Sequence, residues 1–497
     1  MAYSRRDFLT ESISAGVGAA ILSSNPAAIR AAAAPQKPAG GLGNQKRPNI
    51  LVLFPDQWRH DWMSTNRQLP IRTPNLDGLA KMGTQFSKAM VASPLCSPSR
   101  ACLASGMEYD RCLTPSNDSI FPMSRLKTFY GALRDGGYHV MACGKLDLAK
   151  GALWFGLDGK WRIRQWGFSD GINNAGKFDQ LWSYMLNNQN PADPYLVYLQ
   201  SRNLMDIHLA DLQSRLGEGD YGKTAPTPLP QDAYGDDWIT RNGLKLLDEA
   251  PKDKPWFMQV NWICPHDPVD ITAEMEKTVR GRPMPPVNGK NQFDVATNQL
   301  IRQNYTAMCE NIDKQVGIFL DKLKERGELE HTLIVFSSDH GEMLGDHGRW
   351  HKSVPYQPSA GVPMIFAGPG IKPNAQSAVP TTIMDFGATF LDFAGLPPMQ
   401  NDSRSMRPVL TGESTTHRDV VLSGLGSWRM AFDGRYKAIT QFDQHRNDSQ
   451  GFMKRNTAYT KALPNMVFDL DADPRENNDL GSAPPAPAKQ LLDLVRS

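Results

Sequence analysis

Short apolar runs that stop at acidic residues mark the central part of the chain. Residues 48–54 (PNILVLF) stop at Pro55 and Asp56, and residues 332–337 (TLIVFS) stop just before Asp339. Uninterrupted apolar runs of this length are typical of strands that are buried on both faces, as in a parallel sheet. Further strands are expected at residues 138–142, 255–260 and 363–367.

Amphipathic stretches lie between these runs. Residues 73–82 and the longer stretch 304–326 repeat their apolar positions with helical spacing. Strands that alternate with helices predict an α/β fold with a mostly parallel central sheet sandwiched by helices. Ligands of such sheets bind at the carboxyl ends of the strands, where Asp56 and Asp339 are expected.

Two regions depart from this alternation. Residues 151–238 are rich in aromatic residues, Gly, Asn and Pro, which indicates a long insertion rather than sheet. Its aromatic side chains either wall a sugar-like substrate or pack the insertion onto the body. Beyond a main domain at residues 47–410, residues 411–497 predict a C-terminal α/β subdomain. Its antiparallel strands are expected at 429–432, 436–439 and 467–470, and its helix at 488–495.

The N-terminus has the pattern of an export signal. Arg5 and Arg6 precede a short Gly/Ala-rich apolar stretch and a run of alanines. Residues 1–34 are therefore predicted to be a twin-arginine signal peptide, and the Pro/Gly-rich residues 35–46 a linker. The alternative is an amphipathic helix packed on the body. The signal implies export by the Tat machinery to the periplasm or outside the cell, in the folded state and with no membrane anchor after processing.

Composition narrows the classes of partner. The 497 residues are 40% hydrophobic and 21% charged, which is ordinary globular composition and excludes a disordered chain. The formal net charge of +2 gives no reason to expect nucleic acid as a partner. Six cysteines in this length exclude a disulfide scaffold, and some of them are expected to be buried thiols.

The segment from Cys96 to Arg100 (CSPSR) carries the strongest chemical signal. It joins a thiol to a turn proline, a small hydroxyl and a fixed cation. The arginine either lowers the pKa of the thiol or binds an oxyanion through two parallel hydrogen bonds. A loop cysteine before the start of a helix is the structural alternative.

This segment resembles the signature of the type I sulfatases, C-x-P-S-R followed by Leu/Met-Thr-Gly. The matching residues are Cys96, Pro98, Ser99, Arg100 and Gly106, while Ala104 and Ser105 depart mildly. Residues 47–56 are similar to the first strand of that family, and residues 338–348 (SDHGEMLGDHG) to its second metal segment. Residues 436–437 and 468–480 resemble its C-terminal subdomain. The resemblance spans about residues 47–480 and implies an alkaline-phosphatase-like fold.

The resemblance implies a modified nucleophile. In that family a separate formylglycine-generating enzyme oxidises the signature cysteine, here Cys96, to formylglycine, whose hydrate attacks sulfur and releases the alcohol. The implied role of Arg100 is to neutralise developing charge and to orient that hydrate. A plain serine or cysteine would be left with a stable ester, which explains the modification.

The resemblance also implies one divalent metal ion. Its ligands would be Asp56, Gln57, Asp339 and His340, together with the modified residue 96. Many sulfatases have a second Asp in place of Gln57 and an Asn in place of His340, so this chain is most similar to the Asp-Gln/Asp-His subgroup. That subgroup includes choline-sulfatase-like and phosphonate-monoester-hydrolase-like enzymes. Oxygen ligands favour Ca²⁺, while Mg²⁺, Mn²⁺ and Zn²⁺ stay open. The structural alternative makes both aspartates helix caps.

Four further residues match substrate-binding positions of the family. Lys145 corresponds to its sulfate-binding lysine, and His266 and Lys352 are candidates for contacting sulfate and protonating the leaving oxygen. Asn117 is a weaker candidate for the same pocket. The family's G-K-x-H histidine is replaced by Asp147. This aspartate either acts as a base or pairs with Lys145 or Arg100, and His347 or His351 is then expected to fill the gap.

These residues predict an exported hydrolase of a sulfate ester, with a carbohydrate sulfate as the first expected substrate. A phosphonate monoester or phosphodiester hydrolase that uses the same formylglycine is the second hypothesis, because sulfuryl and phosphoryl groups are both tetrahedral. The third is a non-catalytic protein that binds sulfated glycans, and it rests on Asp147 alone. The sequence carries no prediction of oligomeric state.

Overall fold

The central sheet contains eight strands in the order β5-β4-β6-β1-β7-β8-β2-β9. The computed structural model describes residues 47–217, 219–444 and 463–496; the predicted signal peptide and linker lie outside these ranges. Strands β5 to β7 of this order are mutually parallel, whereas β8 is antiparallel to β7 and β2. The bounds are β1 (Asn49–Leu53), β2 (Gly83–Phe86), β4 (His139–Gly144), β5 (Asp170–Asn173), β6 (Trp256–Asn261), β7 (Thr332–Ser337), β8 (Met364–Ala367) and β9 (Ala375–Ser377). The predicted mostly parallel sheet is confirmed.

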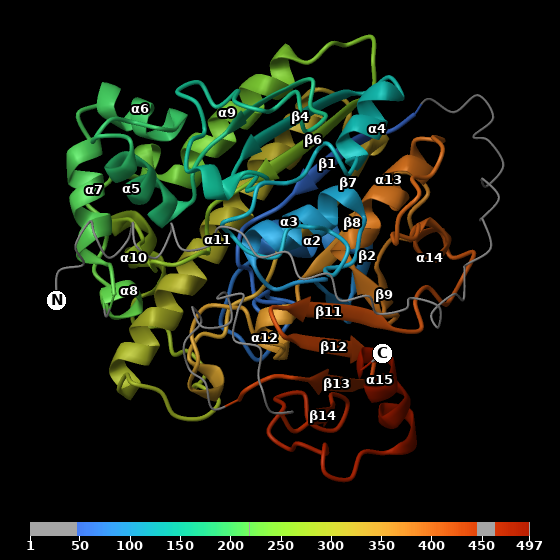
Figure 1. Cartoon of the computed structure of the whole chain (residues 1–497). Coiled ribbons are helices and arrows are strands. Elements are labelled where there is room, and N and C mark those ends of the chain that lie inside the picture. Colours follow the sequence, from blue (N-terminus) through green and yellow to red (C-terminus); the bar gives the residue numbers. More distant parts are fainter. Residues whose placement is uncertain (1–46, 218, 445–462, 497) are drawn as a thin grey trace. The chain divides into compact units, whose positions relative to one another are not determined.

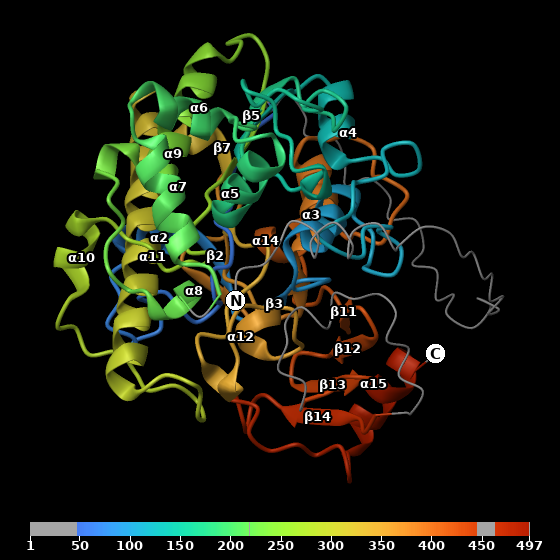
Figure 2. The same ribbon diagram turned by 60° about the vertical axis from the view of Figure 1, so that its left-hand side comes forward.

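Helices cover both faces of this sheet (Figures 1 and 2). One face packs against α2 (Pro74–Met82), α9 (Gly235–Glu249) and α11 (Val295–Glu325), and the other against α3 (Cys96–Ser105), α4 (Phe129–Asp135) and α13 (Phe386–Phe393). Successive residues of a strand point to opposite faces. Ile50 and Val52 of β1 therefore join the core beneath α3 and α4, while Leu51 and Leu53 join the core beneath α9 and α11. This explains why β1 reads as an unbroken apolar run.

Helix α11 starts earlier than the sequence pattern indicated. It begins at Val295 rather than near residue 304, because the side chain of Asp294 accepts a hydrogen bond from the Thr297 amide at 2.7 Å and caps the first turn. The apolar periodicity is weak in this first part of the helix, so the cap fixes the start.

The expectation that residues 151–238 contribute nothing to the sheet is wrong at one place. Strand β5 pairs in parallel with β4 and forms an edge of the main sheet. The rest of the segment is mainly helical, with α5 (Lys177–Leu186), α6 (Pro194–Ser201), α7 (Met205–Ser214) and α8 (Gly219–Gly222). Trp166, Tyr195 and Trp238 are buried in the core, so these aromatic residues pack the segment onto the body.

A second, antiparallel sheet follows the main one along the chain. It consists of β11 (Val421–Leu425), β12 (Trp428–Phe432), β13 (Tyr436–Thr440) and β14 (Met466–Asp469), and α15 (Ala486–Arg496) lies against it (Figure 1). Ala431, Ala438 and Val467 face α15, while the other face joins the main core. The predicted subdomain is confirmed with one further strand, β11. The remaining elements are β3 (Ala89–Met90), β10 (Thr381–Thr382), α10 (Ala273–Val279), α12 (Gln357–Ala360), α14 (Arg407–Thr411) and short 3₁₀ turns that include η1 (Lys150–Ala152).

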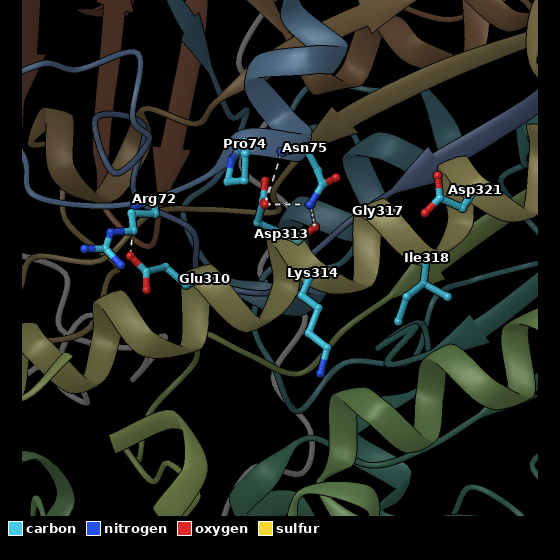
Figure 3. A pocket seen from close by; sticks show the side chains of 9 residues that line it. All are labelled: Arg72, Pro74, Asn75, Glu310, Asp313, Lys314, Gly317, Ile318 and Asp321. Atoms are coloured by element: carbon cyan, nitrogen blue, oxygen red, sulfur yellow. Dashed lines mark hydrogen bonds between the residues drawn. The ribbon is translucent and has the colours of Figure 1, made fainter. Parts of the chain in front are cut away.

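A surface pocket beside α2 and α11 contains none of the predicted site residues. Its lining residues are Arg72, Pro74, Asn75, Glu310, Asp313, Lys314, Gly317, Ile318 and Asp321 (Figure 3). Asp313 accepts hydrogen bonds from the Leu76 amide at 2.8 Å and the Asn75 amide at 3.2 Å. This carboxylate therefore caps α2 in the absence of a cap from Thr73.

Among the described residues, no helix combines the length and apolar character that crossing a membrane requires.

Candidate active site

The order of the parallel strands brings the predicted residues together. Strands β4, β6, β1 and β7 are neighbours, and their carboxyl ends meet at one edge of the sheet. Lys145 follows β4, Asn261 ends β6, Asp56 follows β1, and Asp339 follows β7. Residues far apart in the sequence thereby form one buried cluster.

Helix α3 supplies the nucleophile position. Cys96 is its first residue, and the Ser97 amide beside it donates to the side chain of Asn117 at 3.0 Å. Asn117 therefore lies next to Cys96, where it holds the start of α3. Gly106 ends the helix with φ of +67°, and a Cβ there would lie 2.2 Å from Asn401. The signature glycine is thus required by both backbone conformation and space.

Cys96 and three side chains around it form a candidate metal site. The ligand atoms of Asp56, Cys96, Asp339 and His340 all lie within 4.8 Å of one another, and all four residues are buried. Oδ1 of Asp56 is buried and has no hydrogen-bond partner among the residues that the structure describes. A bare carboxylate oxygen in such a place is costly unless a cation binds it. The donor set therefore fits a divalent metal, and both aspartates face this cluster instead of serving only as helix caps.

Gln57 lies beside this cluster and bonds to other predicted residues. Its amide oxygen accepts a hydrogen bond from Nζ of Lys352 at 2.5 Å, and its backbone N–H donates to Oδ1 of Asp339 at 3.1 Å. Its role as a metal ligand stays a prediction, since the same oxygen is engaged by Lys352.

Two cations contact the carboxylates of this cluster. Arg100 donates from Nε to Oδ2 of Asp339 at 2.9 Å, and its Nη2 lies 3.5 Å from Oδ2 of Asp56. Lys145 pairs with Asp56, and its Nζ lies 3.5 Å from Sγ of Cys96. Arg100 thus holds both candidate metal-binding carboxylates, while Lys145 faces the nucleophile.

The charges around Cys96 favour its anionic form. Burial alone raises the pKa of the thiol, but the positive charges of Lys145, Lys352 and His340 outweigh it, and the pKa lies well below its ordinary value. Sγ also lies 3.2 Å from Nε2 of His340. The surroundings of this position are therefore built for a negative or strongly polarised group.

His266 and Lys352 form a pair on another side of the site. Nζ of Lys352 lies 2.6 Å from Nε2 of His266, and Nδ1 of His266 lies 2.6 Å from the carbonyl oxygen of Asp267. Lys352 is buried, whereas His266 is partly exposed. A proton held between these two nitrogens is in a position to be transferred to a group that enters from the exposed side.

Four further side chains contribute to the site. Asn261 accepts from Arg100 at 3.1 Å, and the side-chain amide of Gln57 donates to Asp267 at 2.9 Å and to Glu342. Tyr221 donates to Glu342 at 2.7 Å. Asp267 directly follows His266, and Glu342 lies two residues after His340, so their closeness to predicted site residues was a usable signal. Tyr221 belongs to the aromatic residues of 151–238 that the sequence analysis singled out as a group, whereas nothing local marks Asn261.

Asp147 is an ion-pair partner in this structure. Its Oδ2 lies 3.2 Å from Nζ of Lys145 and 3.3 Å from Nζ of Lys150. This supports pairing over the base role that the sequence left open. The two histidines expected to fill the gap lie elsewhere: His351 contacts Asp267 at 3.2 Å, and His347 stacks on Tyr356.

Comparison with known families decides the identity of this arrangement. The model of the family described as Sulfatase matches residues 48–396, which is most of the chain. The chain belongs to the sulfatase family. This sulfatase is therefore a sulfuric ester hydrolase, and its family implies a metal ion and a formylglycine, for which the cluster around Cys96 is the candidate site.

Its relatives share most of their length with it. An arylsulfatase of Clostridium perfringens is 24% identical over 90% of this chain and 93% of its own, and an N-acetylglucosamine-6-O-sulfatase of Bacteroides thetaiotaomicron is 26% identical over 90% and 86%. Among solved structures, the phosphonate monoester hydrolase of Agrobacterium radiobacter has a TM-score of 0.70 at 22% identity, covering 90% of this chain and 93% of its own. This structural similarity supports the alkaline-phosphatase-like fold.

Proposed function

We propose that this sulfatase hydrolyses a sulfate monoester of a carbohydrate, using a formylglycine formed from Cys96. The observation that carries the proposal is the buried cluster of Asp56, Cys96, Asp339 and His340, surrounded by the cations of Arg100, Lys145 and Lys352. A sulfate ester is a tetrahedral anion, and fixed cations in a site shielded from water stabilise the charge that develops on it.

The residues divide the work by position. When bound, the divalent cation supplies positive charge to the sulfate oxygens, and the formylglycine at position 96 supplies the nucleophile. Asp56, Asp339 and His340 would hold the metal, and Arg100 fixes both carboxylates. Lys145 would bind a sulfate oxygen because its ammonium group lies beside position 96. Lys352 and His266 would hold the proton that the leaving oxygen accepts.

A carbohydrate as the alcohol is supported by the rim of the site and by relatives. The ring centroids of Tyr221 and Trp350 lie 4.5 Å apart, and that of Tyr221 lies 5.1 Å from the ring of His351. Trp350 precedes His351 in the sequence and is partly exposed. An aromatic ring offers an apolar face to the C–H groups of a sugar. A further structural neighbour, with a TM-score of 0.70 and 20% identity, was solved with its substrate D-glucosamine-2-N,6-O-disulfate.

The phosphonate monoester or phosphodiester alternative keeps one specific observation in its favour. The metal cluster contains His340, with Gln57 beside it, as the sequence analysis expected for the subgroup that includes such enzymes. The non-catalytic alternative has lost its basis, because Asp147 pairs with Lys145 and the chain belongs to a family of hydrolases.

One protein preparation tests the sulfatase proposal and the phosphonate alternative together. After co-expression with a formylglycine-generating enzyme, the tryptic peptide of residues 89–100 should lose about 18 mass units, the change from thiol to aldehyde. The same protein should hydrolyse 4-nitrophenyl sulfate and sulfated glucosamine faster than 4-nitrophenyl phenylphosphonate, and Cys96→Ala should abolish all three activities. A modified protein that turns over only the phosphonate would establish the alternative. A modified protein with no turnover of any substrate would refute both.

Export and the metal are proposals of the same kind. The paired arginines support Tat export, which predicts that the mature protein in the periplasm starts after residue 34 and that Arg5→Lys with Arg6→Lys retains the precursor in the cytoplasm. The carboxylate pair supports Ca²⁺, which elemental analysis of the purified protein tests directly. Export of the double variant to the periplasm would overturn the export proposal. A transition metal bound in stoichiometric amount would overturn the Ca²⁺ proposal.

A further inference from the structure

A line of alternating charges leads from the nucleophile position toward the surface. Nζ of Lys145 lies 3.2 Å from Oδ2 of Asp147, the same oxygen lies 3.3 Å from Nζ of Lys150, and Nζ of Lys150 lies 2.6 Å from Oδ2 of Asp179. We call these four side chains the ion chain. Lys145 and Asp147 are 1% and 0% exposed, Lys150 and Asp179 12% and 13%.

Two segments of the chain build the ion chain. Lys145 and Asp147 lie in the loop between β4 and η1, Lys150 begins η1, and Asp179 lies in the first turn of α5. The backbone at the start of α5 packs closely against these side chains. A Cβ at Gly176 would lie 2.7 Å from Oδ2 of Asp179 and 2.9 Å from Cε of Lys145. Close packing therefore holds these four side chains against one another, unlike ion pairs between mobile side chains on the surface.

Lys145 and Lys150 share Oδ2 of Asp147, and this sharing affects the charge that Lys145 presents to a substrate. Lys145 faces Cys96 and is the candidate for binding an anionic ester, yet it also contacts the carboxylate of Asp147. Lys145 already pairs with Asp56, so a second aspartate that paired with Lys145 alone would leave it too little positive charge for the substrate. Because Lys150 binds the same Oδ2, its positive charge offsets the negative charge of Asp147 and weakens the attraction between Asp147 and Lys145.

We propose that Lys150 is a positioning residue for sulfate binding, which neutralises Asp147 so that Lys145 keeps its charge for the anionic group of the substrate. Asp179 anchors Lys150 in that place. In this chain, Lys150 thus compensates for an aspartate at the position where the family resemblance predicts a histidine. The inference rests on the proposed function, since it presumes that Lys145 meets the sulfate group.

The two charges can be removed separately and together. Lys150→Gln should raise the KM for 4-nitrophenyl sulfate about tenfold or more, with a smaller change in kcat, because an unneutralised Asp147 then competes for Lys145. Adding Asp147→Asn should restore most of the KM, and Lys150→Arg should stay near wild type. Asn and His are both tolerated at the left-handed backbone of residue 147, whose φ is +52°. Lys150→Gln should also cost little in an Asp147→His background.

The controls separate charge from folding. Lys160→Gln makes the same chemical change at an exposed lysine that pairs with Asp170 at 2.8 Å, and should leave KM unchanged. Formylglycine content and thermal midpoint are measured for every variant. Calorimetric titration with inorganic sulfate should show the same order of affinities without turnover.

Two results would overturn the inference. One is a Lys150→Gln variant whose KM and sulfate affinity stay within about twofold of wild type. The other is an equal loss with and without Asp147→Asn, since independent effects add. Were Lys150→Gln to unfold, Asp179→Asn is the second variant, and the same restoration by Asp147→Asn is required of it. A wild type without sulfatase activity would refute the proposed function instead, whereas an active wild type with an unaffected Lys150→Gln refutes only this inference.

Discussion

Removal of Lys437 should be among the most damaging single changes outside the cluster around Cys96. Lys437 of β13 and Glu476, which follows β14, are both 0% exposed, and Nζ lies 2.7 Å from Oε1. Nζ also donates to the carbonyl oxygen of Pro355 at 3.0 Å, and Oε2 of Glu476 accepts from the Gln357 amide at 2.6 Å. The pair therefore ties the antiparallel sheet to the segment that follows Lys352.

The size of the effect follows from burial. Lys437→Met keeps most of the side-chain volume but leaves the carboxylate of Glu476 buried with its Oε1 unpaired. Loss of one member of a buried pair costs about 3–5 kcal/mol, whereas replacing both members is often nearly neutral. Lys437→Met with Glu476→Gln should therefore be at least about 2 kcal/mol more stable than the sum of the two single losses predicts. Because the segment after Lys352 loosens, turnover should fall in Lys437→Met as well.

Equilibrium unfolding in urea, followed by tryptophan fluorescence, measures this. Trp428 is a suitable reporter, because it lies on β12 next to β13 and donates to the carbonyl oxygen of Ser353 at 3.2 Å. The pair of Arg435 and Asp469 provides a control, since the side chain of Arg435 is 54% exposed and Arg435→Gln should cost much less stability than Lys437→Met. A loss below about 1 kcal/mol for Lys437→Met, or strict additivity in the double variant, would refute the reasoning.

Three further predictions concern the metal, the pocket beside α2 and the end of α3. Asp339→Asn should lower the metal content measured by elemental analysis, because one of two carboxylates in the cluster loses its charge; equal content in variant and wild type would exclude it as a ligand. Burial raises the pKa of Asp313 to about 6 from 3.8, so ionisation of this group costs stability as the pH rises between these values. Wild type should therefore lose up to about 3 kcal/mol relative to Asp313→Asn between pH 4 and pH 7 in urea titrations, and a pH-independent difference would contradict this. Gly106→Ala should lower the thermal midpoint, because a Cβ there meets Asn401 at 2.2 Å; an unchanged midpoint would show that the loop around residue 401 yields easily.

The sequence by itself determined the elements whose local signal is strong. The apolar runs of β1 and β7, the acids that follow them and the signature around Cys96 are all readable without the fold, because burial on both faces excludes polar residues from a central strand. Weak local signals failed. Strand β5 (DGIN) and strand β9 (AQS) carry almost no strand propensity and exist because a neighbouring strand offers them hydrogen bonds.

Only the tertiary structure decided which residues meet. The alignment of four parallel strands places Asn261 beside Arg100, and the path of the chain after β7 places Glu342 beside Gln57. The position of α5 brings Asp179 to Lys150, and that contact turns Asp147 from an apparent defect into part of an ion chain. Such contacts join residues between 29 and 285 positions apart with no periodic trace. They are set by strand register and helix packing, which depend on the whole chain and not on any single segment.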